Sequence, residues 1–322
     1  MIKVENLKKA FGPKLAVNGI SFSVERGEVL GFLGPNGAGK STTMRMITGF
    51  IPPTEGRITV GGNDITTNPI EAKRLIGYLP ENAPAYSDMT VRSFLNFSAQ
   101  VRGLSGRERR QAIDRVIELC FLENVIHQSV DTLSKGYRHR TCFAQSIIHD
   151  PDILILDEPT DGLDPNQKHE VRSIIKRMGE KKAIIFSTHI LEEVEAVCSR
   201  AIIVDRGQIV ADGTPDALKQ KSPNFGSVFL RLRGVEASAA KERLSQLGSV
   251  DKVLVMEDNS GGTLSLKVTP KNSTSDGELA SNVADAANQS SWRIEELRTE
   301  EGKLDEVFRN ITKPDTASEV AA

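Results

Sequence analysis

Residues 34–42 place glycines, a lysine and two hydroxyl side chains in an order that suits a polyphosphate. They read GPNGAGKST, contain the pattern G-x-x-x-x-G-K-[ST], and follow the apolar residues 29–33. Glycines let several backbone N–H groups face one anion, and a helix that starts here adds the positive end of its dipole. The lysine could reach the β- and γ-phosphates, the serine could bind Mg²⁺, and the threonine could bond a phosphate oxygen. The predicted phosphate-binding residues are Gly34, Pro35, Asn36, Gly37, Ala38, Gly39, Lys40, Ser41 and Thr42.

Two carboxylates follow a second apolar segment. Residues 153–156 read ILIL, as expected for a buried strand, and Asp157 and Glu158 come directly after them. In phosphate-loop enzymes an aspartate in this place holds Mg²⁺, usually through water. A neighbouring glutamate can act as a general base on attacking water. We therefore predict that Asp157 is a magnesium ligand and Glu158 the catalytic base.

The size and charge of the chain limit what it can be. Its 322 residues suggest about two domains. The net charge of −2 argues against a protein that holds nucleic acid mainly by bulk charge. Three scattered cysteines without zinc spacing indicate a reducing compartment. No apolar segment nears the roughly 20 residues of a membrane span, and the first residues lack the apolar centre of a signal peptide. We expect a cytoplasmic protein whose membrane role would need a partner.

The elements that must hold these motifs alternate between strands and helices. Short strands are predicted within residues 1–60, and buried strands recur at 153–156, 183–186 and 201–204. Between them, Thr90 should cap one helix, and SGRE at 105–108 has the pattern of a capping box that opens another. This order predicts an α/β fold with a helical subdomain.

A second domain is predicted after a change of composition near residues 221–224. Its elements are strand 228–233, helix 237–247, strand 252–257, strand 263–268, helix 277–288, strand 292–299 and a final helix at 303–312. The order βαββαβ of the first six is that of a small α+β ferredoxin-like unit. The last ten residues should form a flexible tail.

Three further motifs, in a fixed order, make residues 1–220 resemble the ATP-binding subunits of ABC transporters. LSKGY at 133–137 resembles the signature segment of that family, usually LSGGQ. DGLD at 161–164 resembles its D-loop, and STH at 187–189 resembles the segment that carries its switch histidine.

The resemblance implies a domain division and an adenine site. An ABC ATPase domain of the α/β P-loop type would span 1–221, with an N-terminal antiparallel β subdomain and a helical subdomain at about 88–150. An accessory domain would span 222–312 before the tail 313–322. Phe11 resembles the aromatic residue that stacks on adenine, and Val17 stands where a side chain packs beside the base.

The resemblance also implies a mechanism. Two ATPase domains of this family dimerise head to tail, so that each ATP lies between one subunit's phosphate loop and the other's signature. Ser134 and Gly136 would then bind the γ-phosphate from the opposite subunit. His189 would stabilise that phosphate, and Asp164 would couple the two sites. The closing motion would supply the mechanical work.

The chain departs from the family pattern at three positions. Glu81 stands where the Q-loop usually has glutamine, and as an oxygen ligand it could still contact Mg²⁺ with Ser41 and Asp157. Lys135 and Tyr137 replace a glycine and a glutamine of the signature. Lys135 could favour phosphate or could simply be solvated. We predict slow but real ATP hydrolysis.

The implied partners are integral-membrane permease subunits and a second ATPase subunit, with the chain peripheral on the cytoplasmic face of the membrane. Residues 82–89 should form a groove with the helical subdomain in which a short permease helix docks. Tyr86 is either part of that groove or an ordinary loop aromatic. The C-terminal unit, ending in LDEVF at 304–308, resembles the accessory domain of ABC-2-type exporter ATPases, and the gliding-motility and copper-maturation ATPases look close.

Other functions are less well supported by the sequence. A soluble ABC-type ATPase acting on nucleic acid or ribosomes usually has two ATPase domains, a long coiled-coil insertion or a zinc module, and this chain has one phosphate loop and none of those patterns. A regulatory subunit without turnover would not need Lys40, Asp157, Glu158 and His189 together. A GTPase is disfavoured because no Asn-Lys-x-Asp segment is present to recognise guanine.

Overall fold

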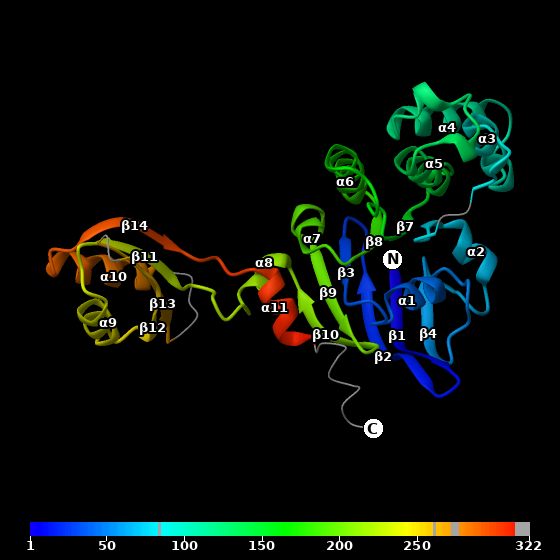
Figure 1. Ribbon diagram of the computed structural model, residues 1–322. Coiled ribbons are helices and arrows are strands. Elements are labelled where there is room, and N and C mark those ends of the chain that lie inside the picture. The colour runs from blue at the N-terminus through cyan, green and yellow to red at the C-terminus, as the bar shows by residue number, and fades with distance from the viewer. Residues whose placement is uncertain (83–84, 260–261, 272–276, 313–322) are drawn as a thin grey trace. The chain divides into compact units, whose positions relative to one another are not determined.

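The computed structural model describes residues 1–82, 85–259, 262–271 and 277–312. The chain divides into two compact units, Met1–Pro215 and Asp216–Ala322 (Figure 1). The change of composition at 221–224 falls shortly after this division. The first unit holds the phosphate loop, the two carboxylates and the signature, D-loop and histidine segments, whereas LDEVF at 304–308 belongs to the second unit.

A six-stranded sheet forms the centre of the first unit, in the order β10-β9-β3-β8-β7-β6. Its strands are β3 (Val29–Leu33), β6 (Ile76–Leu79), β7 (Ile153–Asp157), β8 (Ala183–Thr188), β9 (Arg200–Asp205) and β10 (Gln208–Gly213). All pairs are parallel except β9 with β10. Every residue of β3, β7 and β8 is buried. The prediction that these continuous apolar segments are strands buried on both faces is confirmed.

The strand order brings the chemical motifs to one edge of this sheet. Strand β8 lies between β3 and β7, with Leu33 paired to Thr188 and Asp157 paired to Ser187. The phosphate loop follows β3, the Asp-Glu pair ends β7, and the histidine follows β8. Because the carboxyl ends of parallel strands meet at the same edge, three segments far apart in sequence become neighbours.

An antiparallel sheet of order β2-β1-β4-β5 forms the N-terminal subdomain. It consists of β1 (Ile2–Phe11), β2 (Lys14–Val24), β4 (Glu55–Val60) and the two-residue β5 (Asn63–Asp64). One apolar core joins this sheet to the six-stranded sheet and to α1 (Lys40–Ile47). The tip of the β1–β2 hairpin, where Phe11 pairs with Lys14, is therefore held at a fixed place beside the phosphate loop.

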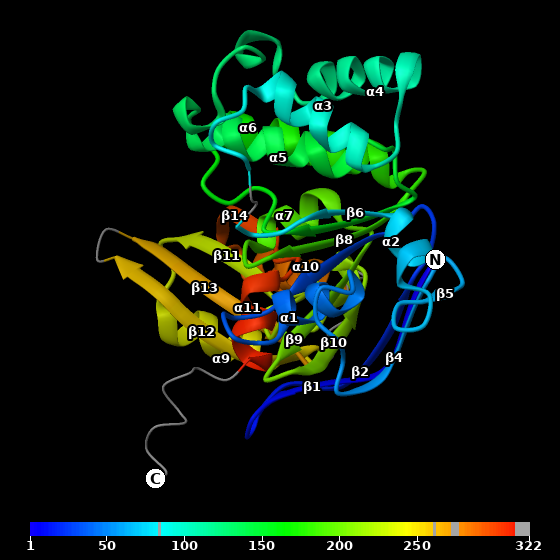
Figure 2. The ribbon, with the colours of Figure 1, turned by 90° about the vertical axis from the view of Figure 1, so that its right-hand side faces the viewer.

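A group of three helices forms the helical subdomain, visible above the sheets in Figure 2. These are α3 (Val91–Val101), α4 (Gly106–Leu119) and α5 (Lys135–Ile147), which pack on one another. Thr90 accepts a hydrogen bond from the Ser93 N–H, so the predicted cap of α3 is confirmed. Ser105 begins α4, but its side chain makes no capping hydrogen bond, so the predicted capping box is wrong in that detail. Two short 3₁₀ turns, Glu123–Val125 and Val130–Thr132, join α4 to α5.

The remaining helices of the first unit lie near the carboxyl edge or connect strands. They are α2 (Pro69–Arg74), α6 (Pro165–Gly179) and α7 (Leu191–Val197), with α8 (Pro215–Lys219) at the division between units. Asp164 caps α6 by accepting from the Gln167 N–H at 2.9 Å, and Pro165 fills the first helical position. Helix α7 packs on α6, β3 and β8.

The second unit has the predicted βαββαβ order. It contains β11 (Val228–Arg233), α9 (Ala237–Ser245), β12 (Val250–Asn259), β13 (Thr263–Pro270), α10 (Glu278–Gln289), β14 (Arg293–Thr299) and α11 (Leu304–Ile311). The antiparallel sheet order β12-β13-β11-β14 places the first and third strands at the centre, as in a ferredoxin-like unit. Residues 313–322, predicted to be a flexible tail, lie outside the described residues.

The sequence predicted neither a membrane-spanning segment nor a disulfide framework. Within the described ranges, no helix has the length and apolar character needed to cross a membrane. The three cysteines, Cys120, Cys142 and Cys198, are all buried and form no disulfide. Burial raises the pKa of the Cys142 thiol to about 11, which keeps it protonated and inert at neutral pH.

Candidate nucleotide-binding site

A polar cavity of about 470 Å³ opens at the carboxyl edge of the central sheet. Its walls come from the hairpin tip, the phosphate loop, the start of α1 and the carboxylates after β6 and β7. The lining residues are Phe11, Lys14, Ala16, Asn36, Gly37, Gly39, Lys40, Ser41, Thr42, Glu81 and Glu158. The structure thus brings together at one cavity nine of the residues that the sequence singled out.

The phosphate loop can adopt its shape only with glycine at position 39. Gly39 has φ of 105°, and a Cβ atom there would lie 2.5 Å from the Ala16 carbonyl oxygen. A side chain would therefore be strained and would collide with the β2 backbone. The loop residues Gly34, Pro35 and Ala38 belong to the same turn but do not line the cavity.

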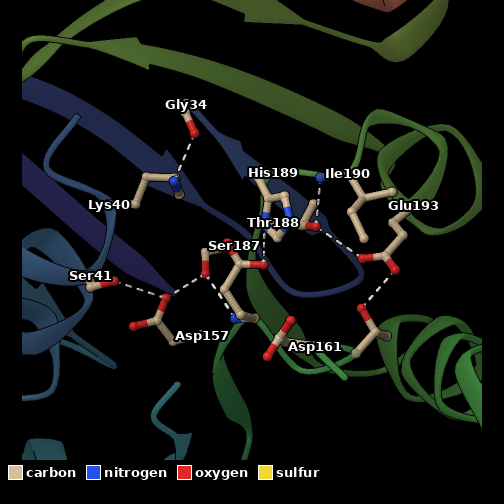
Figure 3. A network of polar contacts seen from close by, with 12 residues as sticks. Gly34, Lys40, Ser41, Asp157, Asp161, Ser187, Thr188, His189, Ile190 and Glu193 are labelled. Carbon is tan, nitrogen blue, oxygen red and sulfur yellow. Dashed lines mark hydrogen bonds and ion pairs between the residues drawn. The ribbon is translucent and has the colours of Figure 1, made fainter. Parts of the chain in front are cut away.

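Lys40 is buried at the base of the loop. Its Nζ donates a hydrogen bond to the carbonyl oxygen of Gly34 at 2.7 Å (Figure 3). It also donates to the carbonyl oxygen of Pro35 at 3.2 Å. Burial lowers the pKa of the Lys40 ammonium, while the nearby carboxylates of Glu158, Asp157 and Glu81 oppose that shift. The lysine is thus a partly desolvated cation aimed along the loop, a strong partner for a phosphate.

Asp157 has the surroundings expected of a magnesium ligand. Its Oδ1 accepts from the Ser41 hydroxyl at 3.2 Å and from the Ser187 hydroxyl at 2.5 Å, whereas its buried Oδ2 has no hydrogen-bond partner (Figure 3). A buried carboxylate oxygen without a partner is costly unless a cation or water satisfies it. The donor set of one carboxylate and one hydroxyl is the kind that Mg²⁺ takes when phosphates and waters complete its shell. The described residues contain no group of three or more acidic, His or Cys ligands that could hold a metal alone.

Glu158 is held in a strained backbone conformation beside this aspartate. Its φ is 51°, which is uncommon for a residue other than glycine and often marks a functional site. The backbone N–H of Glu158 donates to two oxygens of Ser187, the hydroxyl oxygen at 3.0 Å and the carbonyl oxygen at 3.2 Å. Its side chain is 12% exposed, and His189 Nδ1 lies 3.0 Å from its Oε2. Burial raises the pKa of the Glu158 carboxyl, opposed by the hydrogen bond to His189.

The hairpin side of the cavity partly differs from the prediction. Phe11 lies at the rim, 51% exposed, where a flat ring could stack on it. Val17, however, is 1% exposed in the apolar core and does not line the cavity. Side chains alternate along β2, so Ala16 faces the cavity and Val17 faces the core. Ala16 and Lys14 are the cavity residues that sequence reasoning missed, and this alternation was the signal that could have found them.

The signature residues lie apart from this cavity. Ser134 caps α5 by accepting from the Tyr137 N–H, and Gly136 is buried in the first turn of that helix. Neither lines the cavity of its own chain, and the same holds for Asp164. Lys135 forms an ion pair of 3.0 Å with Asp161, so in this structure it contacts the D-loop rather than being simply solvated.

Glu81 follows β6 and lines the cavity opposite the phosphate loop. Glu81 is exposed. Its negative charge raises the pKa of Lys40 and so opposes the lowering that burial causes. This position suits an oxygen that reaches a nucleotide-bound cation, as the sequence predicted.

The fold and the cavity define the class first: the chain is a P-loop nucleotide-binding protein. The family model described as ABC transporter matches residues 17–161. The linearmycin resistance ATP-binding protein of Bacillus subtilis is 34% identical over 97% of this chain and 98% of its own length. A Nod factor export ATP-binding protein of Burkholderia orbicola is 36% identical over 76% of this chain and 80% of its own. A solved ATP-binding subunit of an ABC transporter, 29% identical, superimposes with a TM-score of 0.64 over 69% of this chain and 92% of that one.

The chain therefore belongs to the ABC transporter ATP-binding proteins. It is an ATP-binding and ATP-hydrolysing subunit of a transporter, which confirms the class predicted from the ordered motifs.

Proposed function

We propose that this chain hydrolyses Mg²⁺-bound ATP between two copies of itself, or between itself and a related ATPase, and so drives export through separate permease subunits at the cytoplasmic face of a membrane. The observation that carries the proposal is the meeting of Lys40, Asp157 and the Glu158–His189 pair at the edge of one cavity. Export is supported by the relative from Burkholderia orbicola, which is named for Nod factor export.

Different residues of the cavity bind the phosphates, hold Mg²⁺ and accept the proton of the attacking water. Lys40 and the loop N–H groups bind the β- and γ-phosphates, while Ser41, Asp157 and Glu81 would hold Mg²⁺. When bound with ATP, this cation neutralises charge on the phosphate oxygens. Glu158 accepts a proton from the attacking water, and its burial beside His189 suits that role because a raised pKa makes a carboxylate a stronger base.

The proposed ATP-bound dimer is supported by the absence of the signature residues from the cavity of their own chain. Ser134 and Gly136 sit at the N-terminus of a 13-residue helix but do not reach the cavity of their own chain. A γ-phosphate bound at one chain's loop could meet this helix end only from a second subunit. ATP would thus join the subunits, and loss of the γ-phosphate would let them separate.

Magnesium removal tests the metal assignment. We expect the purified chain to hydrolyse ATP slowly with Mg²⁺ and to lose activity on addition of EDTA, with recovery when Mg²⁺ is restored in excess. Release of inorganic phosphate measures the rate. An Asp157→Asn variant should bind ATP but respond weakly to Mg²⁺, because the orphan Oδ2 is replaced by an amide that cannot ligate the cation. A parent activity that survives EDTA would contradict the assignment.

An apolar groove of about 310 Å³ on the helical subdomain is the proposed docking site for a permease helix. It is lined by Ala85, Tyr86, Phe94, Phe97, Ser98, Val101, Arg102 and Gln145. The Tyr86 ring is 58% exposed and packs edge-on against Phe97, with ring centroids 5.4 Å apart. The predicted groove segment 82–89 includes residues 83–84, which lie outside the described residues.

Truncation of Tyr86 tests this docking. We expect Tyr86→Ala to weaken co-purification with the permease subunits of its transporter roughly 5- to 30-fold, because an aromatic anchor in an interface contributes about 1–2 kcal/mol. ATP hydrolysis by the isolated chain should not change. Phe121→Ala is the matched control, since Phe121 is exposed in the same subdomain but does not line the groove. Equal permease binding by the parent and both variants would refute the assignment.

A further inference from the structure

Glu193, on α7, is a fully buried carboxylate to which the nucleotide chemistry above assigns no role. Its exposure is 0%, so its two oxygens depend on protein partners in place of water. Two cations of α6 approach it: Arg172 Nη2 at 2.9 Å and Lys168 Nζ at 3.7 Å, both to Oε1. Buried charges persist in proteins when they are paired and hydrogen-bonded in this way.

Two threonine hydroxyls complete the contacts of this carboxylate. Thr160 Oγ1 donates to Oε1 at 2.7 Å, and Thr188 Oγ1 donates to Oε2 at 2.9 Å (Figure 3). Both threonines are themselves buried. Glu193 thus bridges two segments that leave neighbouring strands, one after β7 and one at the end of β8.

These two segments carry the proposed catalytic pair. Thr160 is two residues after Glu158, and Thr188 is the residue before His189. The Thr188 hydroxyl also accepts from the Ile190 N–H at 3.0 Å, which closes a tight turn around the histidine (Figure 3). The carboxylate therefore fixes the backbone on both sides of the 3.0 Å contact between His189 Nδ1 and Glu158 Oε2.

We propose that Glu193 is a positioning residue that sets the distance between Glu158 and His189 by binding Thr160 and Thr188 at once. This inference rests on the proposed roles of that pair. A bridge of this kind is stiff because each hydroxyl is buried and no water replaces a lost contact. Small shifts of a catalytic group reduce the rate steeply, so the bridge should act on turnover more than on ATP binding.

A purely structural role makes a different prediction. If Glu193 only holds α7 against α6 through Arg172 and Lys168, the hydroxyl contacts should matter little to the histidine. Thr188→Val and Glu193→Gln together separate the two readings. The valine removes the hydroxyl at nearly constant volume and leaves the ion pairs intact, but it also removes the acceptor of the Ile190 N–H, which Glu193→Gln keeps. Thr188→Ser keeps the hydroxyl and serves as the rescue variant.

The experiment compares Thr188→Val, Thr188→Ser and Glu193→Gln with the parent. We expect Thr188→Val to lower kcat about tenfold with the Kd for ATP changed less than about twofold, and Thr188→Ser to restore most of the rate. Glu193→Gln should also lower kcat, since an amide cannot accept from both hydroxyls and both cations. Glu192→Gln is the control, because Glu192 is the exposed neighbour on the same helix.

A second readout does not depend on activity. In protein with isotope-labelled histidine, the His189 signal, assigned with His189→Gln, should move in Thr188→Val and return in Thr188→Ser, while the other four histidines stay unchanged. An unmoved His189 signal, or a Thr188→Val variant with parental kcat, would overturn the inference. A parent that hydrolyses no ATP would instead refute the proposed function, and the His189 signal would still decide whether the bridge positions that residue.

Discussion

Glu158→Gln should lower the rate of ATP hydrolysis by about 10²- to 10³-fold, the largest effect on turnover expected for this chain. Glutamine keeps the size of the side chain but cannot accept the proton of the attacking water. The Glu158 side chain is 12% exposed, and its Oε2 lies 3.0 Å from His189 Nδ1. Phosphate release under steady-state conditions measures the change.

The same variant should accumulate a dimer that holds ATP. If ATP joins two subunits and its cleavage separates them, blocking cleavage leaves the joined form in place. Size-exclusion chromatography with light scattering should show twice the mass of the 35.2 kDa chain with Mg²⁺ and ATP, and the monomer with ADP. Addition of Ser134→Arg to this variant should abolish the dimer, because the arginine would fill the space of the opposite γ-phosphate.

Two controls bound the Glu158 prediction. Glu192→Gln makes the same chemical change at an exposed position and should leave hydrolysis and mass unchanged. Binding of ATP by Glu158→Gln should match that of the parent within about twofold. If Glu158→Gln hydrolysed ATP as fast as the parent, the base assignment would be wrong.

Lys40→Ala should weaken ATP binding roughly 10- to 150-fold. A hydrogen bond to a charged group contributes about 1.5–3 kcal/mol, and Lys40 offers one from a buried ammonium to the phosphates. Binding of ADP should fall less if the lysine contacts the γ-phosphate as well as the β-phosphate. Equilibrium titration with a fluorescent ATP analogue measures both affinities.

The stability of this variant shows whether the loss is local. Burial of the Lys40 ammonium costs stability, as its lowered pKa indicates, and the alanine variant no longer bears that cost. The variant also loses the two stabilising hydrogen bonds from Lys40 to loop carbonyls. These contributions oppose each other, so the Tm of the protein without nucleotide should change little. The rise in Tm that ATP gives the parent should largely disappear. Lys3→Ala, an exposed lysine of the same unit, should keep that rise.

Local patterns were enough to predict most elements and the phosphate-binding chemistry. The segment after β3 needs its glycines, its lysine and its hydroxyls in one fixed order, because a single loop must turn around one anion. The buried strands could be predicted from continuous apolar segments, since both of their faces are covered. In the second unit, β11 has the predicted bounds, and the other elements shift by only a few residues at their ends.

The details that failed depended on contacts between segments. Val17 and Ala16 are adjacent in β2, and which of them faces the cavity was decided by how that strand lies on the core. Ser105 begins α4 without the capping bond its sequence favoured. The sequence left Lys135 open between a phosphate contact and solvation, and it gave no sign of the ion pair of 3.0 Å with Asp161 that the fold brings about.

The sequence by itself determined that this chain is an ATP-binding protein, and it predicted which residues carry the chemistry, because those requirements are satisfied within short segments. Only the tertiary structure decided how the segments meet. No sequence pattern indicated the proposed positioning role of Glu193, since its partners Thr160, Arg172 and Thr188 come from three separate segments of the chain. The physical reason is that a hydrogen bond depends on distance in space, and the strand order β3-β8-β7 sets those distances at the edge of the sheet.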